Sequence, residues 1–349
     1  MRLRRADSIG DCSVRIESDM TDQPRIGIIG AGAMGSSLAA ITSRFAPTAI
    51  VCKEPERAAQ IFEHGVRCTG AFEANARPVI IRNASEFADI GGVQYVFIAV
   101  KTTSLQEVCE ELAPLSESIR QPGHSEIKLI SYQNGIDPGR AIMDMLGTTK
   151  VMRMVLRYGA MIRDDQGTVD IIMHDPPHFI GCLDEAVRPD CEYFAQHFTD
   201  VGFGTNYIPD IETPVWTKGI INAAINPVCA LVNADIGEVF DSPSRELVVR
   251  MLEEGQAVAE AAGIDLGKDF RERALGLASK STHHLPSMVY DIQQGRPSEV
   301  GQLNRQIVDR AHALGVDVPT HETIDALIAT FDWRVYHQHK ESGTIQPTG

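Results

Sequence analysis

The sequence lacks long apolar runs and an excess of basic charge. No run of about 18 or more apolar residues occurs in its 349 residues, so no transmembrane helix is expected. The net charge of −15 argues against a nucleic-acid surface and against binding to anionic lipid. An acidic protein can still hold a locally positive pocket, so the charge leaves an anionic small-molecule substrate open.

Cysteine and histidine are present, but not in the patterns of a metal site. The seven cysteines are odd in number, scattered and never spaced as C-x-x-C. That usage is typical of a reducing cytoplasm, without a disulfide framework or structural zinc. His174 and His178 are close in sequence, but two prolines between them prevent a shared helical face. We therefore expect a cytoplasmic protein and no metal.

The length of the chain favours two domains, and its two ends differ from the rest. Residues 1–24 begin with basic residues but contain no apolar segment, so they fit neither a secretory signal nor a transit peptide. We expect a disordered extension there, and the sequence leaves open whether Met1 or Met20 is the native start. The polar residues 338–349 predict a loose tail.

Apolar runs and helical patterns alternate from Arg25 onward. The expected strands cover residues 25–30, 49–52, 94–100, 128–132 and 150–155. The expected helices cover residues 36–45, 55–64, 104–112, 137–146 and 188–200. Such alternation indicates βαβ units and a parallel sheet, so we predict a Rossmann-type dinucleotide-binding domain over 25–208. Within 157–183 the chain is turn-rich, and DDQG predicts a hairpin turn.

The character of the sequence changes after Pro209, where strand patterns stop. Helical patterns cover residues 214–234, 243–263, 268–279, 298–314 and 321–332. The sequence thus predicts an all-α domain over 209–337, which we expect to hold substrate and catalytic groups. The predicted fold class is α/β, with a parallel-sheet domain followed by a helical domain.

A glycine-rich stretch joins the first expected strand to the first helix. Gly30, Gly32 and Gly35 form a G-x-G-x-x-G pattern. In this pattern the glycines permit a tight turn, close approach of a pyrophosphate and close packing of helix on strand. The helix N-terminus adds unpaired N–H groups. The predicted cofactor contacts are Gly30, Ala31, Gly32, Ala33, Met34 and Gly35.

The end of the second strand bears on which dinucleotide binds. An acidic residue there suits the ribose hydroxyls of NAD, whereas a basic residue suits the additional phosphate of NADP. Lys53 and Arg57 favour NADP, and Glu54 between them leaves NAD open. We predict Lys53 as a cofactor contact, while Arg57 also fits an ordinary exposed helix residue.

A polar stripe marks the first helix of the second domain. Lys218, Asn222 and Asn226 follow one another at intervals of four in WTKGIINAAINP. Each interval turns the helix by about 40°, so the three side chains share a face of an otherwise apolar helix. Buried polar groups need partners, and a ligand cleft supplies them. Pro227 then predicts a kink, because its ring crowds the carbonyl of Ala223.

The combination of a dinucleotide site and a lysine cleft suggests a reaction. Hydride transfer to a carbonyl carbon leaves an oxygen that needs a proton. A partly buried lysine can donate that proton and stabilise the developing negative charge. We therefore predict that Lys218 is the general acid and that the Asn222 and Asn226 amides bind substrate or ribose.

The chain from about 25 to 332 resembles the ketopantoate reductase family, the 2-dehydropantoate 2-reductases. The resemblance implies NADPH-dependent reduction of 2-dehydropantoate to (R)-pantoate, a step of pantothenate and coenzyme A synthesis. It is carried first by GAGAMG, then by AVKTT and YQNG in the expected order. It implies that Lys101 contacts the cofactor and that Asn134 is a catalytic residue that also lies against the nicotinamide.

Two later motifs extend the resemblance to the second domain. WTKGIINAAINP matches the family's lysine helix, which implies Lys218 as the acid and Asn222 as a substrate contact. PSMVYDIQQGRPSEV implies that Ser287 binds the substrate and that Glu299 orients the substrate and the lysine. Taken without the resemblance, Ser287 also fits a helix cap and Glu299 a first-turn carboxylate.

Two departures from the family leave the substrate less defined than the reaction. His284 stands where relatives often have asparagine, and Ile236 stands where many have a polar amide. A related NAD(P)-dependent reductase or hydroxyacid dehydrogenase for another 2-oxo acid therefore stays open. So does a non-catalytic NADP-binding sensor. The sequence is compatible with a monomer or a homodimer.

Overall fold

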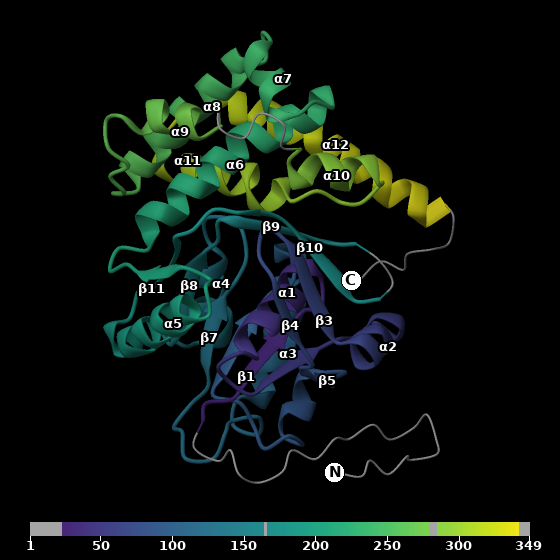
Figure 1. The fold of residues 1–349 in the computed structure, drawn as a ribbon. Coiled ribbons are helices and arrows are strands. Elements are labelled where there is room, and N and C mark those ends of the chain that lie inside the picture. The colour runs from purple at the N-terminus through teal and green to yellow at the C-terminus, as the bar shows by residue number, and fades with distance from the viewer. Residues whose placement is uncertain (1–22, 164–165, 279–284, 342–349) are drawn as a thin grey trace.

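The structure is a computed structural model that describes residues 23–163, 166–278 and 285–341. Figure 1 shows a sheet domain in purple to teal and, on one end of it, a group of helices in green to yellow. The predicted extension over 1–24 and the choice between Met1 and Met20 fall almost wholly outside the described residues. The expected fold class, a Rossmann-type sheet domain followed by a helical domain, is confirmed.

The sheet domain is built on eight strands in the order β12-β11-β8-β7-β6-β1-β2-β5. Neighbouring strands are parallel, except that β11 runs antiparallel to β8. Every strand expected from the apolar runs is present. The eight strands of this sheet, expected or not, are β1 (Ile26–Ile29), β2 (Thr48–Val51), β5 (Val79–Ile81), β6 (Tyr95–Ile98), β7 (Lys128–Ser131), β8 (Val151–Val155), β11 (His178–Cys182) and β12 (Thr205–Tyr207).

A second, smaller sheet has the order β4-β3-β10-β9. It comprises β3 (Val66–Gly70), β4 (Ala74–Ala76), β9 (Tyr158–Ile162) and β10 (Thr168–His174). The antiparallel pair β9 and β10 confirms the expected hairpin, although residues 164 and 165 of its turn lie outside the described residues. The sequence did not predict β3, β4 or β5, because short strands of mixed polarity depend on partners far away in the chain.

Helices cover both faces of the main sheet and leave its strands buried. They are α1 (Ala33–Thr42), α2 (Pro55–His64), α3 (Leu105–Leu112), α4 (Pro138–Leu146) and α5 (Arg188–Asp200). Short 3-10 turns are η1 (Ala84–Phe87), η2 (Thr102–Ser104), η3 (Ala113–Leu115) and η4 (Glu185–Val187). The turns that follow the carboxyl ends of β6, β7 and β8 contact the helical domain.

The helical domain is built around α6 (Glu212–Val232). The domain boundary predicted between residues 208 and 209 lies between β12 and this helix. The other elements are α7 (Ile236–Asp241), α8 (Arg245–Ala261), α9 (Phe270–Ala278), α10 (Ser287–Gln293), η5 (Val300–Gln302), α11 (Asn304–Leu314) and α12 (Pro319–Glu341). Helix α12 continues past residue 338, where the tail was expected to begin, and residues 342–349 are not described. Helix α6 is long and apolar enough to cross a membrane, but 61% of its most apolar 18-residue stretch is buried inside the protein.

The proline inside α6 is compensated by a side chain from α11. Pro227 has no N–H, so the carbonyl of Ala223 loses its usual helical partner. The amide of Asn304 donates to that carbonyl at 2.9 Å. Asn304 is fully buried, and its amide also lies 3.2 Å from Nδ1 of His321, whose Nε2 bonds the carbonyl of Met251. Helix α6 therefore continues through Pro227 as one element.

We expect Asn304→Ala to lower the free energy of unfolding by about 1–3 kcal/mol, because the buried carbonyl of Ala223 would lose its donor. The measurement is urea unfolding followed by far-UV circular dichroism. Pro227→Ala restores a backbone N–H at position 227, so the cost of Asn304→Ala should be smaller in that background. Equal costs in both backgrounds would contradict the compensation.

Candidate active site

The glycine stretch has the backbone that a dinucleotide loop requires. Gly30 has a φ of +111°, a left-handed conformation that favours glycine. A Cβ on Gly35 would lie 1.8 Å from the carbonyl oxygen of Gly30, so only glycine permits this packing. At Gly32 a Cβ would meet nothing within 4 Å. Gly32 also caps α1 without a side-chain bond, so the first N–H groups of α1 have no side-chain cap, which is the arrangement that a phosphate can bind.

The basic residues near the end of β2 have partners within the protein. Lys53 lies 2.8 Å from Glu107 and 3.0 Å from Glu111, both on α3, and these carboxylates raise the pKa of the lysine. Arg57 is only 6% exposed and bonds the carbonyl of Ala31 and the hydroxyl of Ser36. The reading of Arg57 as an exposed helix residue is therefore wrong. Its guanidinium stabilises the glycine loop through the bond to the carbonyl of Ala31.

Lys218 lies at the junction of the two domains. Its ammonium donates to Oδ1 of Asn134 at 2.9 Å and to the carbonyl of Leu156 at 2.7 Å. Asn134 follows β7 and Leu156 follows β8, so the lysine of α6 contacts the carboxyl ends of two parallel strands. In open α/β sheets this end is where ligands bind.

The surroundings of Lys218 change its acidity. Desolvation lowers the pKa of its ammonium to about 8, and the buried guanidinium of Arg153 contributes in the same direction. Glu299 acts in the opposite direction, by attraction. The carboxyl group of Glu299 bonds the side chain of Asn134, and burial raises its pKa despite the nearby ammonium groups of Lys101 and Lys218. The predicted residues Lys218, Asn134 and Glu299 thus form one cluster.

Lys101 follows β6 and pairs with a carboxylate of the helical domain. Its ammonium lies 3.0 Å from Asp291 on α10, which is nearly buried and also binds Arg296. Lys101 itself is half exposed, so it can still reach a ligand. The sequence did not predict a role for Asp291, although it belongs to the PSMVYDI segment. The sequence feature that could have indicated this role is an acidic residue on a helix face that is otherwise apolar, because a buried carboxylate needs a basic partner.

Comparison with known proteins agrees with this geometry. The family model for ketopantoate reductase PanE/ApbA matches residues 26–180, and the model for its C-terminal domain matches residues 210–332. The chain belongs to the ketopantoate reductase family. The family match confirms the resemblance that the sequence motifs carry. The members of this family are oxidoreductases that act on CH–OH groups.

Curated relatives extend over almost the same length. The 2-dehydropantoate 2-reductase of Archaeoglobus fulgidus is 27% identical over 305 residues, which cover 87% of this chain and 96% of the relative. The enzyme of that name from Mesorhizobium japonicum is 29% identical over 338 residues, with the same two coverages. The similarity therefore includes both domains.

Solved structures share the fold. A PanE/ApbA family ketopantoate reductase from Ralstonia eutropha has a TM-score of 0.78 at 22% identity, covering 90% of this chain and all of the other. D-mandelate dehydrogenase, solved with NADH and anilino(oxo)acetate, has a TM-score of 0.78 at 20% identity and covers 89% of this chain and 99% of its own. A dimeric ketopantoate reductase from Staphylococcus aureus scores 0.69 at 20% identity, covering 89% and 99%.

The remaining predicted substrate contacts lie on α6 and α10 and have no side-chain hydrogen bond to a described residue. Asn222 and Asn226 are half-buried on α6, and neither amide has a hydrogen bond to a described residue. Ser287 is exposed at the first position of α10, again without a described side-chain bond. Asn233 ends α6 in a left-handed conformation and accepts a bond from Gln293, so the polar stripe of α6 ends at Asn226.

Two departures from the family pattern are placed differently by the structure. Ile236 is 7% exposed and belongs to the apolar core of the helical domain. His284 lies outside the described residues. The apolar side chain at position 236 is therefore part of this core.

His174 and His178 come together although no helix joins them. Their ring centroids are 5.2 Å apart, and both rings pack on Phe203 in an aromatic cluster. Burial lowers the pKa of His178 to about 3, so this ring is neutral. Among the described residues, no group of three or more His, Cys, Asp or Glu side chains is arranged for a metal ion.

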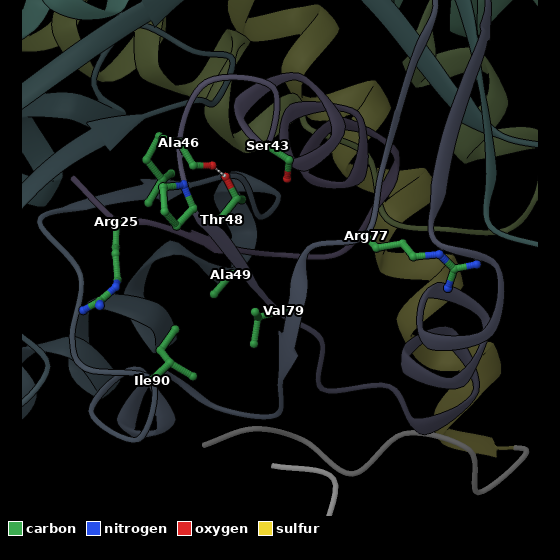
Figure 2. A pocket seen from close by; sticks show the side chains of 10 residues that line it. Arg25, Ser43, Ala46, Thr48, Ala49, Arg77, Val79 and Ile90 are labelled. Atoms are coloured by element: carbon green, nitrogen blue, oxygen red, sulfur yellow. Dashed lines mark hydrogen bonds between the residues drawn. The ribbon is translucent and has the colours of Figure 1, made fainter. Parts of the chain in front are cut away.

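A separate hollow of about 200 Å³ lies at the opposite end of the main sheet (Figure 2). Arg25, Thr48 and Val79 line it, at the amino ends of their strands. Figure 2 shows the guanidinium of Arg77 turned away from the hollow, and it bonds the carbonyls of Phe62 and Glu63. No residue predicted for the active site lines this hollow.

We expect Gly32→Ala to weaken nucleotide binding by roughly tenfold or more without changing the melting temperature, because the added methyl group enters open space where a pyrophosphate approaches. The measurement is calorimetric titration with NADPH and with NADH, alongside thermal unfolding. Gly35→Ala is the control, since its methyl group would clash with the backbone and lower the melting temperature. Unchanged affinity in Gly32→Ala would contradict the placement.

Proposed function

We propose that this protein reduces 2-dehydropantoate to (R)-pantoate with NADPH, within pantothenate and coenzyme A synthesis. The observation that carries the proposal is the ammonium of Lys218, held by Asn134 and Leu156 where the domains meet and next to the carboxyl group of Glu299. Family membership supports the same reaction class, and relatives across both domains bear the name 2-dehydropantoate 2-reductase.

The chain's own residues supply the acid and the binding groups of this reaction. When bound, NADPH supplies the hydride. Lys218 donates the proton to the carbonyl oxygen, and its positive charge stabilises the negative charge that develops there. Asn134 accepts a bond from the lysine and would also contact the nicotinamide of the bound cofactor. Glu299, which bonds Asn134, orients both the lysine and the substrate.

Polar groups of α6 and α10 that have no hydrogen bond to a described residue are suited to a small hydroxylated acid. Asn222 and Asn226 offer amides without adding charge, and Ser287 offers a hydroxyl together with the N-terminus of α10. Lys101 offers a positive charge for the cofactor or for an anionic group. These groups support a 2-oxo acid as the substrate.

The preference for NADPH is supported by the basic residues after β2. Lys53 is half exposed and can turn from Glu107 and Glu111 to a phosphate. Arg57 stands behind the carbonyl of Ala31 and adds positive charge to this region. Glu54 and the two glutamates of α3 oppose that charge, which favours NADH.

A panel of 2-oxo acids with NADPH and NADH tests the proposal. Turnover is followed by the loss of nicotinamide absorbance. The proposal requires 2-dehydropantoate with NADPH to give the highest kcat/KM. Turnover of a branched or aromatic 2-oxo acid while 2-dehydropantoate is inert would assign the chain to a different reductase of this family. Cofactor binding without turnover of any acid would support a non-catalytic sensor.

We expect Lys218→Ala to lower kcat by about 100- to 10,000-fold while the Kd for NADPH changes little, because the lysine acts on the carbonyl and not on the nucleotide. Lys53→Ala is the matched control, since it should weaken NADPH binding and leave kcat largely unchanged. A Lys218→Ala enzyme with normal kcat would exclude the assigned role.

The acidity of Lys218 gives a separate prediction for the native enzyme. The general acid must be protonated at the start of reduction, and burial lowers its pKa to about 8. The kcat/KM for reduction should therefore be high below that value and fall as the pH rises through about 8. A profile measured from pH 6 to 10 that stays flat would contradict a proton donor with this pKa.

Location and assembly stay predictions. We infer a cytoplasmic enzyme with a small-molecule substrate and with neither nucleic acid nor membrane as a partner, on the basis of charge and cysteine usage. The sequence allows a monomer or a homodimer. Light scattering of the purified protein distinguishes the two.

A further inference from the structure

The loop that carries Asn134 is held by the domain on the other side of the junction. This loop, residues 134–137, is the second part of the segment between β7 and α4 in the sheet domain. Helix α11 of the helical domain contacts it through two side chains. Oε1 of Gln306 accepts the N–H groups of Ile136 at 2.9 Å and Asp137 at 3.3 Å.

A second contact from α11 fixes the end of the same loop. Arg310 binds the carboxylate of Asp137 with two bonds, from Nε at 3.1 Å and from a terminal nitrogen at 2.5 Å. Gln306 and Arg310 are four residues apart, so they share one face of α11. Two parallel bonds between guanidinium and carboxylate define orientation as well as distance.

The sheet domain completes the enclosure of the loop. The buried guanidinium of Arg153 on β8 donates to the carbonyls of Gly135 and Ile136. Gly135 has a φ of +107°, and a Cβ there would lie 2.9 Å from the carbonyl oxygen of Gln302. The loop backbone thus has bonded partners on both sides and no room for a side chain at position 135.

The loop also packs against α6 through an apolar side chain, that of Ile136. Ile136 belongs to the core of the helical domain, although it lies in the sheet domain's sequence. A Cβ on Gly219 would lie 2.7 Å from Cγ1 of Ile136, so glycine next to Lys218 permits this contact. The distance between the Asn134 loop and the lysine helix is therefore defined by direct packing.

We propose that Gln306 and Arg310 are positioning residues: they fix residues 135–137 so that the Asn134 side chain meets the ammonium of Lys218. The inference rests on the proposed function for the roles of Asn134 and Lys218. Neither Gln306 nor Arg310 contacts Lys218. Their effect passes through the loop backbone, where a displacement of about 1 Å at a catalytic group can reduce a rate by about 100-fold.

The test uses the full-length protein with Gln306→Ala, Gln306→Glu and Arg310→Ala. Gln306→Ala removes the acceptor and should lower kcat by about 10- to 100-fold, while the Kd for NADPH changes less than about twofold. Gln306→Glu keeps an acceptor oxygen and should recover most of that loss. Asp309→Ala, an exposed change on the same helix, is the matched control and should behave as wild type.

A second measurement does not depend on turnover. The pH dependence of acetylation at Lys218, followed by mass spectrometry, should have a midpoint near 8 in the wild type. In Gln306→Ala and Arg310→Ala the midpoint should rise toward the ordinary value of a lysine, because a displaced loop admits water to the ammonium. If Gln306→Ala does not fold, Arg310→Ala and Gln306→Glu carry the same comparison.

The outcomes separate the two proposals. Wild-type kcat and an unchanged Lys218 midpoint in both alanine variants would overturn the positioning role. An equal loss in Gln306→Ala and Gln306→Glu would also overturn it, since the acceptor would then not matter. If the wild type reduces no 2-oxo acid but the midpoint shifts as expected, the proposed function fails and the positioning of Lys218 stands.

Discussion

The contact between the ammonium of Lys218 and the side chain of Asn134 is the interaction on which the site depends. It joins a helix of one domain to the end of a strand of the other, and Leu156 adds a second acceptor. A partly buried ammonium needs such partners, because desolvation disfavours its charge. The same burial lowers its pKa to about 8, where a lysine can donate a proton near neutral pH.

Helix α6, which carries Lys218, is held in position by contacts that take no part in the proposed reaction. Asn304 supplies the donor that Pro227 cannot, so α6 remains one helix through its apolar core. Gly219 lets Ile136 approach the helix beside Lys218. Polar and apolar contacts thus act together, since a small shift of α6 would move the ammonium away from Asn134.

Charges of opposite sign meet across the domain junction. Lys101 pairs with Asp291, and Glu299 lies near Lys218 and Lys101. Burial makes each isolated charge costly, whereas alternating charges reduce that cost. Beside these charges, the amides of Asn222 and Asn226 have no hydrogen bond to a described residue, so they add neutral groups that suit a ligand.

The sequence by itself determined the parallel sheet, the helical second domain, the glycine loop and the polar stripe of α6. These are local patterns, because a short apolar run, a glycine spacing or a four-residue interval needs few distant residues to be read. Only the tertiary structure decided the small β4-β3-β10-β9 sheet, the burial of Arg57, the Lys101–Asp291 pair and the hold of α11 on the Asn134 loop. Each of these joins segments far apart in the chain, and sequence spacing carries no information on which distant side chains meet.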